Sequence, residues 1–174
     1  MAEDIGESLV GSYLRYVKKC EFILFNTFLP GEQGEIDVIG IHLGATRDIY
    51  FAEVTTHIQG MTYGGNAKTA KKVRDKLLRA QQFGQDRFPD DNHHFQIWSP
   101  RVSVGALTKR FDEMSQEFEA RDERLSFFIN KPYGDAIQEL IEVARTNVRA
   151  TSDPAFRLLQ VLACVKSSQG PVHF

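Results

Sequence analysis

GEIDVIGIHLGATRDIYFAEVTTH, residues 34–57, is the stretch that decides the fold. Its alternation predicts two β-strands joined by a short, polar, glycine-containing turn. Both strands are apolar on both faces, which is typical of a sheet that is covered on each side. Each strand nevertheless carries an acid, Asp37 on the first and Glu53 on the second. An unpaired carboxylate buried there is costly, so we expect a cation opposite the two acids, and a divalent metal ion is the simplest candidate.

The composition is that of an ordinary soluble globular protein, with 42% hydrophobic and 25% charged residues in a chain of 174. This length suits one domain over residues 1–174, with a core at about 3–150, a C-terminal helix at about 153–166 and a flexible tail at 167–174. The net charge of −2 argues against a chain that coats nucleic acid by bulk electrostatics. Any nucleic-acid binding must therefore come from a local patch.

Signals of compartment and targeting are few. Cys20 and Cys164 are too few and too far apart for a disulfide framework or a zinc module, so we expect a reducing cytoplasm. The sequence has no apolar run long enough to span a bilayer, and its acidic start, MAEDIGE, is unlike a signal peptide. The expectation is a cytoplasmic protein with no membrane partner.

The other segments alternate between helical and extended patterns. Helices are expected at residues 3–19, 67–84, 105–123, 133–148 and from Asp153, and further strands at 22–28, 94–99 and 125–129. Pro30-Gly31 predicts a turn after the first strand. This order predicts an α/β fold with a mixed central β-sheet flanked by helices. The short connections between residues 28 and 49 predict that the first three strands form an antiparallel meander.

A third acid, Glu7, lies on the first predicted helix. It shares a stripe with Val10, Gly11 and Leu14, so we expect it on a semi-buried flank, with the glycine allowing the helix to approach the sheet closely. Alternatively, Glu7 only lies favourably near the positive end of the helix dipole.

The three acids resemble the motif of the PD-(D/E)XK nuclease superfamily, whose fold is that of the restriction endonucleases. Its members carry a Glu on an opening helix, G-x-x-D on one strand and (D/E)-x-K on the next. The matches are Glu7, Asp37 in GEIDVIG and Glu53 in YFAEVTT, whereas Thr55 stands where the family usually has lysine. The resemblance implies a restriction-endonuclease-like core, in which a helix precedes a three-stranded meander and a helix and more strands follow.

The resemblance also implies a metal-dependent endonuclease that hydrolyses phosphodiester bonds, with DNA as the expected substrate. Mg²⁺, or Mn²⁺ in its place, prefers a few carboxylates, with waters and substrate phosphate completing six oxygens. Asp37 and Glu53 would be direct ligands, and the carbonyl of Val54 a third. Glu7 would bind a second ion or orient a water.

The helix expected at 67–84 is the strong positive patch of the sequence. Asn66 is its expected cap. Its buried stripe is narrow and consists of Ala70, Val73, Leu77 and Ala80. The rest of its surface predicts a nucleic-acid interface, although such a face is more commonly only solvated. The basic residues of this face are Lys68, Lys71, Lys72, Arg74, Lys76 and Arg79.

Thr55 can hydrogen-bond a water but supplies no charge, whereas the family lysine offsets charge in the transition state. The family tolerates relocation of this lysine to the following helix. Lys68 and Lys72, one turn apart near the start of that helix, are the catalytic candidates, followed by Lys71. Both candidates lie nearly opposite the predicted buried stripe, which counts against them unless the helix packs differently.

Two other interpretations remain open. The departure at Thr55 also suits a catalytically degenerate nuclease fold that acts as a nucleic-acid-binding or assembly subunit of a larger complex. The acids could instead be satisfied by Lys or Arg partners in an interaction or structural protein. Small nucleases of this kind often form homodimers, so a second copy of the chain is a further candidate partner.

Overall fold

The computed structural model describes residues 4–29 and 34–169. Within these residues the helices and strands follow one another in the order expected from the sequence. They are α1 (Ile5–Tyr16), β1 (Phe22–Phe28), β2 (Glu35–His42), β3 (Asp48–Val54), α2 (Asn66–Arg87), β4 (Asn92–Ser99), α3 (Ala106–Glu119), β5 (Arg124–Ile129), α4 (Lys131–Thr146) and α5 (Pro154–Gln169).

The strands of the described residues form a five-stranded mixed sheet in the order β1-β2-β3-β4-β5. β1, β2 and β3 pair antiparallel, which confirms the predicted meander. β4 pairs parallel with both β3 and β5, because α2 and α3 carry the chain back across the sheet between these strands. The molecule is therefore an α/β fold with an open mixed sheet.

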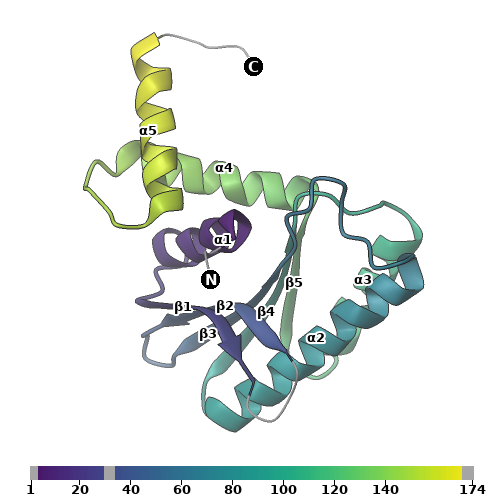
Figure 1. Ribbon diagram of the computed structural model, residues 1–174. Helices are drawn as coiled ribbons and strands as arrows, with labels where there is room; N and C mark the ends of the chain where they lie inside the picture. The colour runs from purple at the N-terminus through teal and green to yellow at the C-terminus, as the bar shows by residue number, and fades with distance from the viewer. Residues whose placement is uncertain (1–3, 30–33, 170–174) are drawn as a thin grey trace.

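Helices cover both faces of this sheet (Figure 1). α2 and α3 pack on one face and α1 and α4 on the other, while α5 packs against α1 and α4. The buried residues form one cluster on the α2 side, which includes Phe51, Leu77 and Phe111, and another on the α1 side, which includes Leu14 and Trp98. The two-sided apolar pattern of β2 and β3 follows from this arrangement.

The packing of α1 positions the N-terminal acid. A Cβ at Gly11 would lie 2.5 Å from Cζ of Phe25 on β1, so the glycine allows the close approach that the sequence predicts. Val10 and Leu14 are fully buried beneath the helix, but Ile5 is 58% exposed. The buried face of α1 includes Val10, Gly11 and Leu14 of the stripe that contains Glu7, and Glu7 itself is half-buried at its flank.

Several element ends differ from expectation. α1 is shorter than 3–19, and α2 continues to Arg87 because Gly84, one turn beyond Ala80, extends its buried stripe. Asn66 is the first residue of α2 rather than its cap, since Gly65, with φ 105°, occupies the N-cap position. α5 includes residues 167–169 of the predicted tail.

The predicted turn at Pro30-Gly31 and the rest of the predicted tail, residues 170–174, lie outside the described residues. Among the helices that the structure describes, none combines the length and the apolarity needed to cross a bilayer.

Candidate functional site

Asp37 and Glu53 lie on adjacent strands, one position beyond the Val38–Ala52 pair of β2 and β3. Both are buried, with exposed fractions of 6% and 5%. The N–H of Val54 donates a hydrogen bond of 2.7 Å to Oδ2 of Asp37, so this carboxylate satisfies a backbone donor where the β2–β3 ladder ends. The hairpin therefore brings together the two acids that the sequence singles out.

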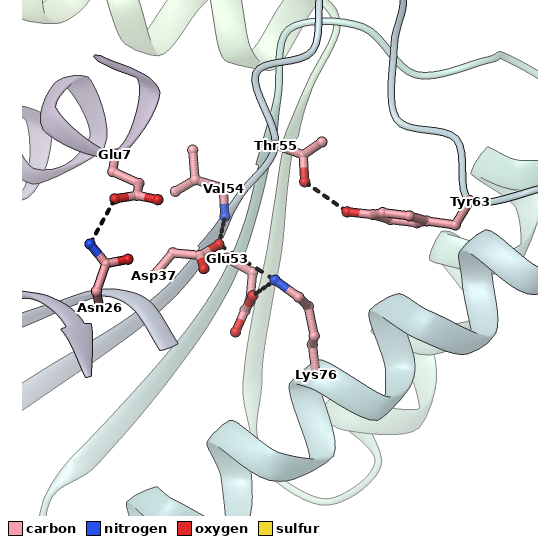
Figure 2. A network of polar contacts seen from close by, with 8 residues as sticks. All are labelled: Glu7, Asn26, Asp37, Glu53, Val54, Thr55, Tyr63 and Lys76. Carbon is pink, nitrogen blue, oxygen red and sulfur yellow. Dashed lines mark hydrogen bonds and ion pairs between the residues drawn. The ribbon is translucent and has the colours of Figure 1, made fainter. Parts of the chain in front are cut away.

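The cation opposite these acids is Lys76, from α2 (Figure 2). Its ammonium donates a hydrogen bond to Oε2 of Glu53 and lies 3.6 Å from Oδ2 of Asp37. Burial alone would lower the pKa of Lys76, but the charges of Glu53 and Asp37 outweigh this effect and raise it above its ordinary value. Lys76 is therefore a fixed ammonium between two carboxylates.

One ammonium leaves the two carboxylates short of positive charge. The pKa of Glu53 is raised to about 8, by burial first and by the charge of Asp37 second, while Lys76 opposes the rise. The pair thus favours a further cation, either a proton or a metal ion. Mg²⁺ commonly binds through one or two carboxylates and keeps several waters, so the chemistry of this donor set fits Mg²⁺ or Mn²⁺. Within residues 4–29 and 34–169 there is no group of three or more His, Cys, Asp or Glu side chains that could hold a metal ion.

Glu7 is half-buried and is held by Asn26, whose Nδ2 donates a hydrogen bond of 3.2 Å to its Oε2 (Figure 2). Burial raises the pKa of Glu7, the Asn26 hydrogen bond opposes the rise, and the charge of Asp37 adds to it. The charges of Glu7 and Asp37 therefore interact, and the role of Glu7 as the third acid of the site stays a prediction.

Asn26 contacts the candidate site through Glu7, and the sequence did not reveal this contact. It lies within β1 yet has φ 48°, a left-handed conformation that is uncommon for residues other than glycine and that is enriched at functional sites. The available signal was an Asn inside the aromatic strand FILFNTF, since Asn is depleted in strands.

Thr55 faces a second hydroxyl rather than a lysine. Its Oγ1 lies 3.3 Å from the hydroxyl of Tyr63, in the loop between β3 and α2. The N–H of Thr55 donates to the carbonyl of Trp98 on β4, which fixes the backbone at the position of the motif lysine.

On α2 it is Lys76, and neither Lys68 nor Lys72, that contacts the acids. The sequence named Lys68 and Lys72 as the relocated lysine, and that catalytic role stays a prediction. Lys68 is exposed, and its Cδ lies 3.6 Å from the position of a Cβ at Gly64. Lys72 is also exposed, and its Nζ lies 3.9 Å from the centroid of the Tyr63 ring.

The remaining residues of the predicted basic face are partly neutralised. Lys71 pairs with Asp75 at 2.7 Å. One guanidinium nitrogen of Arg74 donates to both carboxylate oxygens of Glu117 on α3, at 2.5 and 2.6 Å. The Nε of Arg79 is buried and has no hydrogen-bond partner among the described residues. The face offered to a partner is therefore narrower than the sequence predicts.

Comparison with known proteins adds no relative to this picture: no family model, no curated protein and no solved structure matches the chain.

Proposed function

We propose that the chain is a metal-dependent endonuclease of the PD-(D/E)XK type, which hydrolyses phosphodiester bonds and takes DNA as its substrate. The observation that carries this proposal is the ammonium of Lys76 between the buried carboxylates of Asp37 and Glu53. In this superfamily a lysine accompanies two such acids. Here the lysine comes from α2, which supplies the charge that Thr55 lacks.

We further infer that the fold is the restriction-endonuclease-like core. An opening helix, an antiparallel meander, a crossover helix and a parallel strand follow in that order from α1 to β4. The acids lie where the second and third strands of the meander end their pairing, which supports this inference.

The carboxylates of Asp37 and Glu53 would hold Mg²⁺ or Mn²⁺, with the carbonyl of Val54 as a third oxygen and Glu7 for a second ion or a water. A bound ion of this kind supplies an acidified water and neutralises charge on the phosphate.

The ammonium of Lys76 would donate hydrogen bonds to the attacking water and to a phosphate oxygen, where negative charge grows during the reaction. Removal of one such donor from an active site typically costs about 10²–10³ in rate. Glu7, held by Asn26, would accept a hydrogen bond from water on the other side of Asp37. The cover of α2 keeps these groups out of bulk water, which strengthens their interactions.

A second candidate is a degenerate nuclease fold that binds nucleic acid, or joins a larger assembly, without cutting. It is favoured by Thr55 and by the direct ion pair between Lys76 and Glu53, which already satisfies part of the buried charge without a metal ion. This candidate predicts binding without cleavage.

Cleavage of supercoiled plasmid and of single-stranded DNA by the purified protein, with Mg²⁺ or Mn²⁺, tests both candidates. The nuclease predicts nicking that EDTA abolishes and that Asp37→Asn and Glu53→Gln each remove. Cleavage that survives Glu53→Gln would exclude Glu53 from the reaction. A gel shift without cleavage would favour the degenerate fold, and neither binding nor cleavage would favour a structural protein.

A further inference from the structure

Tyr63 lies beside the candidate site, in the loop between β3 and α2, and three contacts fix its position. Its backbone N–H donates a hydrogen bond of 2.9 Å to Oγ1 of Thr69, whose hydroxyl donates to the carbonyl of Gly65. The ammonium of Lys72 stands 3.9 Å from its ring centroid. Its hydroxyl lies 3.3 Å from that of Thr55.

These contacts place the Tyr63 hydroxyl beside Thr55, the residue two positions beyond Glu53. The hydroxyls of Thr55 and Tyr63 point toward one another (Figure 2). The hydroxyls of Thr55 and Tyr63 and the ammonium of Lys72 therefore form one cluster, which begins two residues beyond Glu53.

Packing alone does not require this arrangement. Tyr63 is only half-buried and Lys72 is exposed, so water could satisfy both polar groups. Neither Lys72 nor the Tyr63 hydroxyl has a carboxylate partner among the described residues, in contrast to Lys71, Arg74 and Lys76. A neutral donor beside an uncompensated cation is a combination suited to a phosphate oxygen.

We propose that the hydroxyl of Tyr63 and the ammonium of Lys72 form a subsite for a backbone phosphate of the nucleic acid, next to the phosphate that is cut. The hydroxyl donates a hydrogen bond to a phosphate oxygen and the ammonium neutralises its charge. Thr55 orients the phenol. The residue at the position of the motif lysine thereby helps to bind the nucleic acid, although it supplies no positive charge. The subsite rests on the proposed nucleic-acid substrate but not on cleavage.

The test is equilibrium binding of short fluorescein-labelled DNA, single-stranded and duplex, followed by fluorescence anisotropy in EDTA over a range of salt concentrations. Tyr63→Phe keeps the ring and its contact with Lys72 and is expected to weaken binding about fivefold, the usual effect of one hydrogen bond. Lys72→Met is expected to weaken binding and to reduce the slope of log affinity against log salt by about one.

The opposite face of the sheet provides matched controls. Tyr16 shares a hydroxyl pair with Thr151 at 2.6 Å, and Lys18 stands 5.7 Å from the ring of Tyr13. Tyr16→Phe and Lys18→Met should leave both affinity and salt slope unchanged.

Weakened binding in Tyr63→Phe and Lys72→Met but not in the controls supports the subsite. The subsite is overturned if Tyr63→Phe and Lys72→Met bind DNA as tightly as the wild type, or if all four variants lose the same affinity. It is also overturned if the wild type binds neither single-stranded nor duplex DNA. If Tyr63→Phe lowers the melting temperature, its weaker binding could come from lost structure. The salt slope of Lys72→Met then decides whether the subsite exists, because a loss of structure would not lower this slope by the value expected for one phosphate contact. Binding that behaves as expected without cleavage in Mg²⁺ would refute the nuclease and leave the subsite standing.

Discussion

Lys76 is central to the candidate site, because among the described residues it is the cation that contacts both buried acids. Lys76→Met should raise the pKa of Glu53 beyond its value of about 8, since the ammonium is what opposes the rise. It should also reduce cleavage by about 10²–10³. NMR titration of the side-chain carboxyl carbons in EDTA measures the first effect without requiring activity.

Lys131→Met is the matched control for this variant, because Lys131 pairs with Asp135 on the exposed surface of α4. It should change neither the titration of Glu53 nor the cleavage rate. A Glu53 that titrates identically in Lys76→Met and in the wild type would show that the ammonium does not act on this carboxylate in solution.

Asn26 combines a left-handed backbone with a hydrogen bond to Glu7, and two substitutions separate these features. Asn26→Gly permits the conformation and Asn26→Ala does not, so the alanine variant should be less stable than the glycine variant by about 1 kcal/mol in urea denaturation. Both should raise the pKa of Glu7, because both remove the hydrogen bond that lowers it. Equal stability of the two variants would show that position 26 is not held in the left-handed region.

The acids could be predicted from the sequence but their lysine could not, and helix geometry explains why. Lys68, Lys72 and Lys76 are spaced four residues apart, and each such step rotates the side chain by roughly 40° around the helix. The rotation brings the series toward the buried stripe, so that Lys76 flanks Val73 and Ala80 while Lys68 points to solvent. The sequence contained this spacing. To choose Lys76 from it, however, one must know how α2 is tilted across the sheet, and long-range packing sets that tilt.

At the scale of elements, the contact between α1 and β1 determines where Glu7 lies. Gly11→Ala would place a Cβ 2.5 Å from Cζ of Phe25. Overpacking of this kind costs about 1–3 kcal/mol, whereas alanine gains about 1 kcal/mol of helix propensity. We expect a net loss of stability in urea denaturation, together with weaker cleavage as Glu7 moves away from the sheet.

Gly134→Ala on α4 is the control, because a Cβ there would meet nothing within 4 Å. Helix propensity should then act alone and stabilise the protein by up to about 1 kcal/mol. If Gly11→Ala were also stabilising, α1 would not be held as closely to β1 as the structure has it.

Most elements follow from local patterns. The strands of the meander and the buried stripes of α2 and α3 occur where their periodicity predicts them, because these segments bury one regular face. The helix ends differ from the predicted ends where the surrounding structure outweighs the preference of a single residue. Asn66, a good capping residue, lies inside α2 because Gly65 has the backbone conformation that begins the helix.

At the scale of the whole molecule, the buried acids link stability to pH and to metal ions. The pKa of Glu53 is about 8 in the folded state against an ordinary 4.5, so the folded state binds this proton more tightly than the unfolded state does. The resulting stabilisation is fully present below pH 4.5 and is lost as pH rises toward 8. Relative to Glu53→Gln, the metal-free protein should therefore melt at progressively lower temperature over this window.

Mg²⁺ should reverse this trend, because it competes with the proton for the same carboxylate. The rise in melting temperature on adding Mg²⁺ should be small near pH 5 and should grow toward pH 8. At a hundredfold excess over Kd, ligand binding contributes about 2.7 kcal/mol, or roughly 5–10 °C for a domain of this size. Scanning calorimetry in EDTA and in Mg²⁺, with Glu53→Gln as the reference, measures both effects. An Mg²⁺ shift that is absent at every pH, or that is as large in Glu53→Gln, would show that the charge deficit at Asp37 and Glu53 is not met by a metal ion.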